Sequence, residues 1–228
     1  MLPLFDLAPT RRFALVTYGL IAANVVVYLW ELRARGARVE HYAFYPCAVS
    51  GPCTGAARGH LPWGEGALAS MFLHASWWHL GGNMLFLFIF GNNVEDVMGR
   101  ARFLVFYVCS GLAAALAQAW VTLHYAGVHA ASVPNVGASG AIAGVLGAYV
   151  VLLPRARVIA LLGFLPLPFS ALFFIGLWCV LQLWQAGFSV THPEAGGGVA
   201  FAAHVGGFLF GALTVRAFQV RPPLGLRR

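Results

Sequence analysis

The sequence has very little charge. Only 9% of its residues are Asp, Glu, Lys or Arg, and lysine is absent, so all fourteen basic residues are arginines. Hydrophobic residues make up 60% of the chain and the mean hydropathy is +0.78, which excludes an ordinary soluble domain. The net charge of +7 does not indicate nucleic-acid binding, because the arginines are scattered between apolar runs, where anionic lipid headgroups are the better partners. The composition predicts an integral membrane protein.

The 228 residues are too few to form both a membrane bundle and a second, soluble domain. A transmembrane helix takes about 20 residues, so residues 1–228 are predicted to form one all-α, polytopic bundle of six transmembrane helices. The expected spans are residues 13–30, 71–93, 101–123, 137–153, 169–186 and 201–218. The first run is of span length and lacks a small-residue cleavage site, which favours a helix over a signal peptide. Pro166 and Pro168 are expected to separate an apolar, interfacial lead-in from the fifth span.

Arginine is distributed unequally between the two sides that six spans define. Four arginines lie on one side, Arg33, Arg35, Arg38 and Arg58, and the other ten share the side of both termini. Positively charged loops favour the cytoplasm. Both termini are therefore predicted to be cytoplasmic, in a bacterial inner membrane, although the three arginines directly after the first span run against the rule.

Cysteine is scarce, with four residues in the chain. Cys109 and Cys179 lie within apolar runs and are expected to be packing residues. Cys47 and Cys53 lie in a loop rich in proline and glycine, with too few other ligands nearby for a zinc site. They form a disulfide if the loop faces an oxidising compartment, and the alternative is two free thiols. The spacing leaves both possibilities open.

A few strongly polar side chains interrupt the apolar runs, and each is a functional candidate because such groups are costly inside a bilayer. His79 and Asn83 are four residues apart in the segment HLGGN, which places both on one face of a helix, one turn apart. Two potential hydrogen-bond donors then share that face. The structural alternative is that they only bond a neighbouring helix.

Ser139 stands in the segment GASG at the start of a helix rich in small residues. The glycines of this segment are spaced by three or four residues and form one stripe: Gly137, Gly140, Gly144 and Gly147. Such a stripe lets another helix approach closely. A serine beside it is usually a packing residue whose hydroxyl bonds the helix backbone, so this motif alone is a weak signal.

His204 is the second residue of the segment AHVGGFLFG. His204, Gly207 and Gly211 share one helical face, so the imidazole lies directly above a glycine contact surface. Packing of that surface on the glycine stripe would bring His204 near Ser139. This suits a Ser–His dyad, in which the imidazole takes the hydroxyl proton. A lone histidine in an apolar helix is more often structural or part of a proton relay, but its conjunction with Ser139 favours the dyad.

The three motifs together resemble those of the rhomboid proteases: HxxxN in the second span, GxSG at the start of the fourth and AHxxG in the sixth. The resemblance extends from about residue 71 to residue 211 and includes the segment Phe72-Leu73-His74, the GNNVED run at residues 91–96 and Gly99. The chain looks more similar to the bacterial and plastid-type branch than to the derlin-like relatives that lack the catalytic pair.

This resemblance implies an intramembrane serine endopeptidase with Ser139 as nucleophile and His204 as general base and later general acid. His79 and Asn83, with the Ser139 backbone amide, would form the oxyanion hole, which fits two donors on one helical face. His74 is implied as a support residue near the water supply of the site. Glu95 is implied as a structural anchor on a cytoplasmic loop.

The chain departs from the family pattern one turn after Ser139, where some members have a tyrosine that packs on the catalytic histidine and this sequence has Ala143. Packing support for His204 is therefore expected from elsewhere. No Asp or Glu falls within the six predicted spans, so a dyad without an acidic third member is predicted. No metal, nucleotide or organic cofactor is required by any of these motifs.

Peptide hydrolysis needs water, which the bilayer excludes, so a water-filled cavity open to the extracytoplasmic side is expected. The resemblance implies single-pass membrane proteins as substrates, cut in or near the transmembrane segment after a small residue. Two alternative functions belong to other classes of protein. A catalytically dead rhomboid-like binder would share the fold, but Ser139 and His204 are both present. A small transporter would line a path with polar residues and use acids for coupling, which the spans lack.

Overall fold

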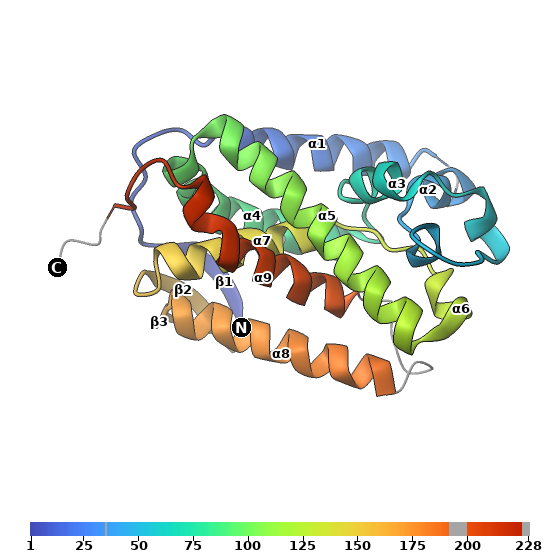
Figure 1. Cartoon of the computed structure of the whole chain (residues 1–228). Coiled ribbons are helices and arrows are strands. Elements are labelled where there is room, and N and C mark those ends of the chain that lie inside the picture. Colours follow the sequence, from blue (N-terminus) through green and yellow to red (C-terminus); the bar gives the residue numbers. More distant parts are fainter. Residues whose placement is uncertain (35, 192–199, 225–228) are drawn as a thin grey trace.

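The computed structural model describes residues 1–34, 36–191 and 200–224, and most of them are helical (Figure 1). The elements are β1 (Leu2–Asp6), α1 (Leu15–Glu31), α2 (Gly36–Tyr42), η1 (Pro46–Ala48), η2 (Gly55–Gly59), α3 (Trp63–Ser70), α4 (Trp77–Met98), α5 (Arg100–Tyr125), α6 (Gly127–Ala131), α7 (Ser139–Leu152), β2 (Arg157–Leu162), β3 (Leu165–Ser170), α8 (Ala171–Thr191) and α9 (Phe201–Phe218). The long helices run side by side, while α2, α3 and α6 gather at one end and the strands at the other.

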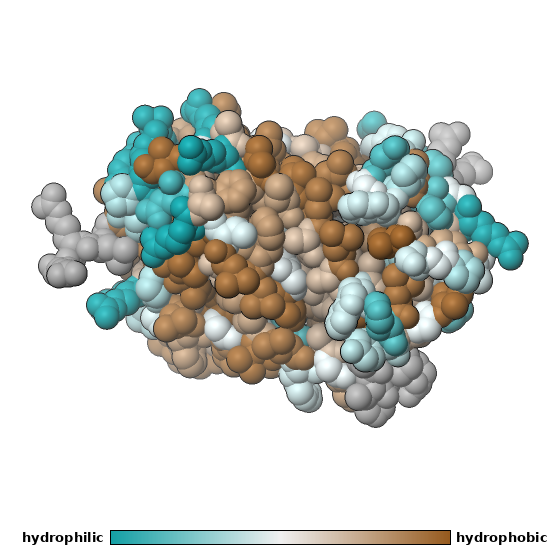
Figure 2. Space-filling model, in the orientation of Figure 1, coloured by the Kyte–Doolittle hydropathy of each residue, from teal (hydrophilic) through white to brown (hydrophobic). Residues whose placement is uncertain are grey.

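Within the described ranges, three helices are long and apolar enough to cross a membrane: α5, α8 over Ala171–Phe188, and α9. The helices α1 and α7 are apolar but shorter. Figure 2 shows apolar side chains across the middle of one face and hydrophilic ones at both ends, as a bilayer requires of a protein that spans it. The predicted membrane bundle is present, and the count of six spans stays a prediction.

The helix α7 lies in the middle of the bundle (Figure 1) and is buried at every residue from Gly140 to Tyr149. Its glycines contact the backbone of α9. A Cβ atom added at Gly207 would overlap the carbonyl oxygen of Gly140, and one added at Gly211 would overlap that of Gly144. The two backbones therefore touch, as the glycine spacing predicted, and no larger residue fits between them.

The N-terminal segment is tied to the last turns of α4 by two carboxylates. Glu95 accepts hydrogen bonds from the backbone N–H groups of Val16 (3.0 Å) and Thr17 (2.7 Å) and from the Thr17 hydroxyl (2.8 Å). A carboxylate there satisfies free N–H groups in the first turn of α1 and complements the helix dipole. Glu95 thus has contacts that suit an anchor, although it lies within α4 and not in a loop.

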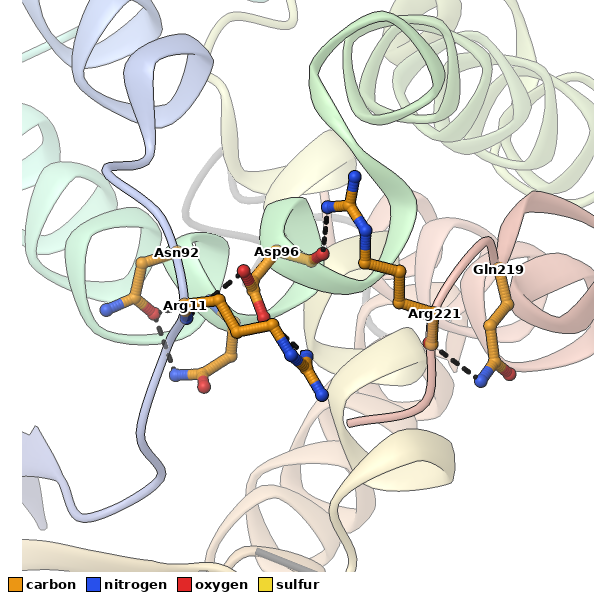
Figure 3. A network of polar contacts seen from close by, with 6 residues as sticks. Arg11, Asn92, Asp96, Gln219 and Arg221 are labelled. Carbon is orange, nitrogen blue, oxygen red and sulfur yellow. Dashed lines mark hydrogen bonds and ion pairs between the residues drawn. The ribbon is translucent and has the colours of Figure 1, made fainter. Parts of the chain in front are cut away.

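Asp96 joins both terminal segments to the same helix end (Figure 3). The Arg11 guanidinium contacts the Asp96 carboxylate at 2.9 Å, and the Arg11 backbone N–H donates to it at 3.2 Å. Arg221, which follows α9, donates to the Asp96 carbonyl oxygen at 3.4 Å. The start of the described chain and the segment after α9 therefore meet at the end of α4.

The all-α prediction missed a three-stranded antiparallel sheet in the order β1-β2-β3. Pro166 and Pro168, which were expected to separate an apolar lead-in from the fifth span, lie inside the edge strand β3, opposite Leu161 and Ile159. Proline is tolerated in an edge strand because its missing N–H faces away from the paired neighbour. The apolar lead-in to α8 is therefore a β-hairpin, and the residues of β1 complete the sheet.

Asp6, the last residue of β1, connects the sheet to the bundle. Its carboxylate accepts hydrogen bonds from the Tyr149 hydroxyl at 2.6 Å and the Asn93 side chain at 2.9 Å. Burial raises the pKa of Asp6 above its usual value, and the two hydrogen bonds act in the opposite direction. The sheet is thus fixed to α7 and α4 by a buried polar contact.

The long connection between α1 and α4 contains four short helices and its own small core, centred on Tyr45. Cys47 and Cys53 are joined by a disulfide, with their Cα atoms 5.4 Å apart, so the alternative of two free thiols is wrong. Phe44 pairs with Asn135 through two backbone hydrogen bonds of 3.1 and 2.8 Å. This connection therefore holds the segment that precedes Ser139.

Candidate active site

Ser139 and His204 are in direct hydrogen-bond contact. Ser139 is the first residue of α7 and His204 lies in the first turn of α9. The distance between Ser139 Oγ and His204 Nε2 is 2.7 Å. The two side chains meet because the glycine surfaces below them let α7 and α9 pack backbone to backbone.

The helix α7 begins at Ser139, whereas the fourth span was expected from residue 137, because of the backbone of Gly137. Gly137 has a φ of +125°, which L-residues rarely adopt and which ends a helix. Its N–H donates to the Ser70 carbonyl oxygen at 2.9 Å. A Cβ atom here would lie 2.7 Å from Cε1 and 2.8 Å from Nε2 of His79. Glycine is therefore required both for the turn and for the close approach of the His79 ring.

Asn83 is held in place by His74. The Asn83 side-chain nitrogen donates to His74 Nε2 at 2.9 Å, and both residues are buried. His74 Nδ1 lies 3.3 Å from the Phe72 carbonyl oxygen, so that nitrogen carries the ring proton and Nε2 is the acceptor. The Glu31 carboxylate in turn accepts from the His74 backbone N–H at 3.1 and 3.2 Å. These contacts orient the Asn83 amide. Only one of its two N–H groups donates to His74.

The side chains of His79, Asn83, Ser139 and His204 border a cavity of about 700 Å³. Its lining includes Trp78, His79, Asn83, Ser139, Trp178 and His204, which come from α4, α7, α8 and α9. The cavity is mainly apolar with a few polar groups on its walls, the usual character of a site that binds an organic substrate. The four residues selected from the sequence thus lie around one space, although they are spread over more than a hundred positions of the chain.

Two residues of α8 contact His204 and were not selected from the sequence. Gln182 Oε1 lies 2.7 Å from His204 Nδ1, and the Trp178 ring centroid lies 5.8 Å from that of His204. Phe201 adds an edge-on contact at 6.4 Å. The packing support missing at Ala143 is thus supplied from α8 and the start of α9. Gln182 is itself a polar side chain in a predicted span, so the criterion that selected His79 could have found it.

The start of α9 is held by a second glutamine. The side-chain oxygen of Gln118, on α5, accepts a hydrogen bond from the Ala203 backbone N–H at 3.1 Å. That N–H belongs to the first turn of α9 and also donates to the Ala200 carbonyl oxygen at 3.1 Å. Gln118 therefore fixes the helix end that carries His204 without touching the imidazole.

A family profile described as the rhomboid domain matches residues 64–220, which is most of the chain and contains every residue of the site. The chain belongs to the rhomboid family. This rhomboid chain is 30% identical over 208 residues to "Rhomboid protein 1, mitochondrial" of Saccharomyces cerevisiae, covering 87% of the chain and 51% of the yeast protein. It is 29% identical over 196 residues to the human "Presenilin-associated rhomboid-like protein, mitochondrial", covering 85% and 45%.

A third relative is the "Putative rhomboid protease YdcA" of Bacillus subtilis, 32% identical over 139 residues, which are 61% of this chain and 62% of that protein. The chain spans about half the length of the yeast and human relatives that it matches. Family membership agrees with the apolar helices in placing this rhomboid chain in a membrane. Because two of these relatives are mitochondrial by name, the bacterial inner membrane and the branch within the family stay predictions.

Proposed function

We propose that this rhomboid chain is an intramembrane serine endopeptidase in which Ser139 is the nucleophile and His204 its base. The observation that carries the proposal is the 2.7 Å contact between Ser139 Oγ and His204 Nε2 at the wall of the cavity. A serine hydroxyl is a weak nucleophile at its free pKa and becomes effective when a neighbouring imidazole accepts its proton. The family relationship supports the same class of chemistry.

The proposed reaction has two halves. Ser139 Oγ attacks the carbonyl carbon of the scissile peptide while its proton passes to His204 Nε2, and the tetrahedral intermediate forms. His204 then gives that proton to the leaving amine as the C–N bond breaks, which leaves an acyl-enzyme. A water molecule repeats the sequence on the ester: its proton goes to His204, the new carboxylic acid departs, and Ser139 regains a proton.

The negative oxygen of each tetrahedral intermediate needs hydrogen-bond donors. The proposed donors are the side chains of His79 and Asn83 and the backbone N–H of Ser139. The Ser139 N–H is available because it belongs to the first turn of α7, and the positive end of that helix dipole points at the same place. Donors fixed in advance around the developing charge account for a large share of the rate of such reactions.

The proposed substrates are single-pass membrane proteins, cut in or near the transmembrane segment after a small residue. The helix α7 has 14 residues, hence a length of about 21 Å, whereas the hydrocarbon core of a bilayer is about 30 Å thick. A nucleophile at the start of so short a helix lies below the membrane surface. The cavity would then bring water to it from the extracytoplasmic side, with both termini in the cytoplasm.

Ser139→Ala tests the proposal because it removes only the attacking oxygen. The purified wild-type protein is expected to cut a fluorogenic transmembrane peptide and to be labelled by a fluorophosphonate probe, and the variant is expected to do neither. Ser50→Ala is the matched control, since Ser50 is exposed in the connection between α1 and α4, and it should cut and label like the wild type. Cleavage by Ser139→Ala at the wild-type rate would end the serine-protease proposal.

A further inference from the structure

The second ring nitrogen of His204 has a defined partner in the membrane part of the protein. Gln182 Oε1 lies 2.7 Å from His204 Nδ1, and Gln182 is partly buried. The surrounding helix α8 is strongly apolar, with the sequence ALFFIGLWCVLQLWQAGFSVT. An amide side chain in such a helix is unfavourable in lipid unless its polar atoms are bonded. The contact with His204 satisfies its carbonyl oxygen.

The direction of this hydrogen bond follows from the proposed chemistry. A base that takes a proton at Nε2 must keep a lone pair there, so the neutral ring carries its proton on Nδ1. The Gln182 carbonyl oxygen is an acceptor and therefore bonds that N–H. A ring protonated on Nε2 would present an N–H to Ser139, and a ring flipped about its Cβ–Cγ bond would present Cε1–H, so neither could accept the proton of Ser139. The amide thus selects the tautomer as well as the ring orientation.

The side chain of Trp178 supports the same ring from one turn earlier on α8. Residues four apart share a helical face, so Trp178 and Gln182 approach His204 together. The indole packs beside the imidazole at a centroid distance of 5.8 Å, while the amide bonds its edge. Packing alone leaves the ring free to flip about its Cβ–Cγ bond, and the hydrogen bond removes that freedom.

We infer that Gln182 is the positioning residue of the dyad, the member that takes the place of an acidic third residue by accepting the Nδ1–H of His204. This inference rests on the proposed function and deepens it. Because the acceptor is on α8 and the base on α9, the base is oriented only while these two helices lie against each other. A neutral amide supplies orientation without burying a charged group between α8 and α9.

Gln182→Leu removes the acceptor and keeps the volume of the side chain. The expected result is a fall in kcat of about 10- to 100-fold, the range for one lost hydrogen bond to a group that becomes charged in the transition state. KM should change little, because Gln182 supports the base and has no proposed contact with the substrate. Gln182→Glu should restore most of kcat, since a carboxyl group of the same reach offers an acceptor oxygen to Nδ1–H whether or not it is ionised.

Two controls separate this role from a structural one. Leu181→Ala changes the preceding residue of α8, which is 46% exposed, and it should leave kcat unchanged. Gln118→Leu removes the other glutamine that holds α9. It is expected to lower the melting temperature, and Gln118→Glu, which keeps an acceptor for the Ala203 N–H, is expected to restore that temperature.

The outcomes distinguish this inference from the function on which it rests. If the wild type does not cut, or if cutting is independent of Ser139, the proposed function fails. If the wild type cuts through Ser139 and Gln182→Leu has the same kcat, the positioning role alone is wrong. Should the Leu variant not fold, Gln182→Met, which is unbranched like glutamine, replaces it. A folded Met variant with wild-type kcat, or a folded Glu variant as slow as the Met variant, would equally overturn the inference.

Discussion

At the scale of single residues, the two proposed oxyanion donors are supported in different ways. His79 is fixed by contact, because its ring lies against the backbone of Gly137 at a distance that only glycine allows. Asn83 is fixed by a hydrogen bond to His74. The tightly packed backbone of Gly137 cannot yield, so the His79 ring is confined, whereas the Asn83 amide depends on one neighbour for its direction.

Asn83→Ala is predicted to reduce the cleavage rate without abolishing it. Loss of one oxyanion donor typically lowers kcat by about 10²- to 10³-fold while the other donors remain. Ser139→Ala and His204→Ala remove the reacting groups, so each should abolish measurable cleavage, and the double variant should be no worse because the pair acts as a unit. Cleavage rate and melting temperature measured on the same purified samples test this.

The competing structural explanation for Asn83 predicts a different pattern. If the side chain serves only to bond neighbouring groups, the Ala variant loses thermal stability, and its activity follows the folded fraction. A variant with the wild-type melting temperature and a rate reduced by the amount above supports the oxyanion role. A fully folded variant that cuts as fast as the wild type would remove Asn83 from the site.

At the scale of elements, the contact between α7 and α9 sets the geometry of the site. The Cβ position of Gly211 is occupied by backbone atoms of Gly144, and that of Gly147 by the Phe208 carbonyl oxygen. Backbone atoms within helices cannot move aside as a flexible side chain can. Glycines, which have no side chain, therefore set the distance between the axes of α7 and α9 where the two helices meet. This distance in turn sets the Ser139–His204 contact.

Gly211→Ala is predicted to destabilise the protein and to lower its activity. The added methyl group would push α9 away from α7, and overpacking of this kind typically costs about 1–3 kcal/mol. Gly176→Ala is the matched control, because a Cβ atom at Gly176 of α8 meets no atom within 4 Å, and alanine is favoured over glycine in a helix by about 1 kcal/mol. Thermal unfolding in detergent should show a lower melting temperature for the first variant only. Equal melting temperatures for the two variants would contradict the proposed backbone contact between α7 and α9.

The hairpin of β2 and β3 exposes large apolar residues at its turn. Phe164 at its turn is 99% exposed, and its neighbours Leu162 and Leu165 are 53% and 66% exposed. The strand β3, which follows the turn, leads directly into the apolar helix α8, and Pro166 and Pro168 remove two N–H donors from the outer edge of β3. An apolar tip with few free donors suits the boundary between lipid and water.

At the scale of the whole molecule, the two ends of the bundle differ in character. The end that holds the sheet also holds the Asp96 cluster, where Arg11 and Arg221 bring both terminal segments together. The opposite end holds the connection with the disulfide between Cys47 and Cys53. Disulfides persist in oxidising compartments and arginine favours the cytoplasmic side, so the predicted orientation, with both termini in the cytoplasm, also predicts an extracytoplasmic location for the disulfide.

Reporter fusions at Arg155 and after the last residue are predicted to show a cytoplasmic location for both. The reason is the ten-to-four distribution of arginines together with an even number of spans. A fusion within the connection that contains Cys47 is the control and should report the extracytoplasmic side. Opposite locations for Arg155 and the C-terminus would show that the model of six spans is wrong.

The sequence by itself determined the membrane class, the candidate residues and the helix faces that meet at the site. Apolar length and glycine spacing act within one helix and follow its period of 3.6 residues, so they can be read locally. For this reason the sequence alone indicates that His79 and Asn83 share a helix. It likewise indicates that His204 shares a helical face with Gly207 and Gly211. The contact between the two glycine surfaces could then be predicted, since each surface is complementary to the other.

Only the tertiary structure decided which distant segments pair. The strand β1 joins β2 from about 150 residues away, and no local pattern in residues 2–6 or 157–162 indicates a partner, because short apolar runs fit a strand or a helix equally well. The bond between Gln182 and His204 likewise depends on how far α8 is rotated and how close it lies to α9. A helix period shows which residues share a face, but the neighbour that a face meets is set by the packing of the whole bundle.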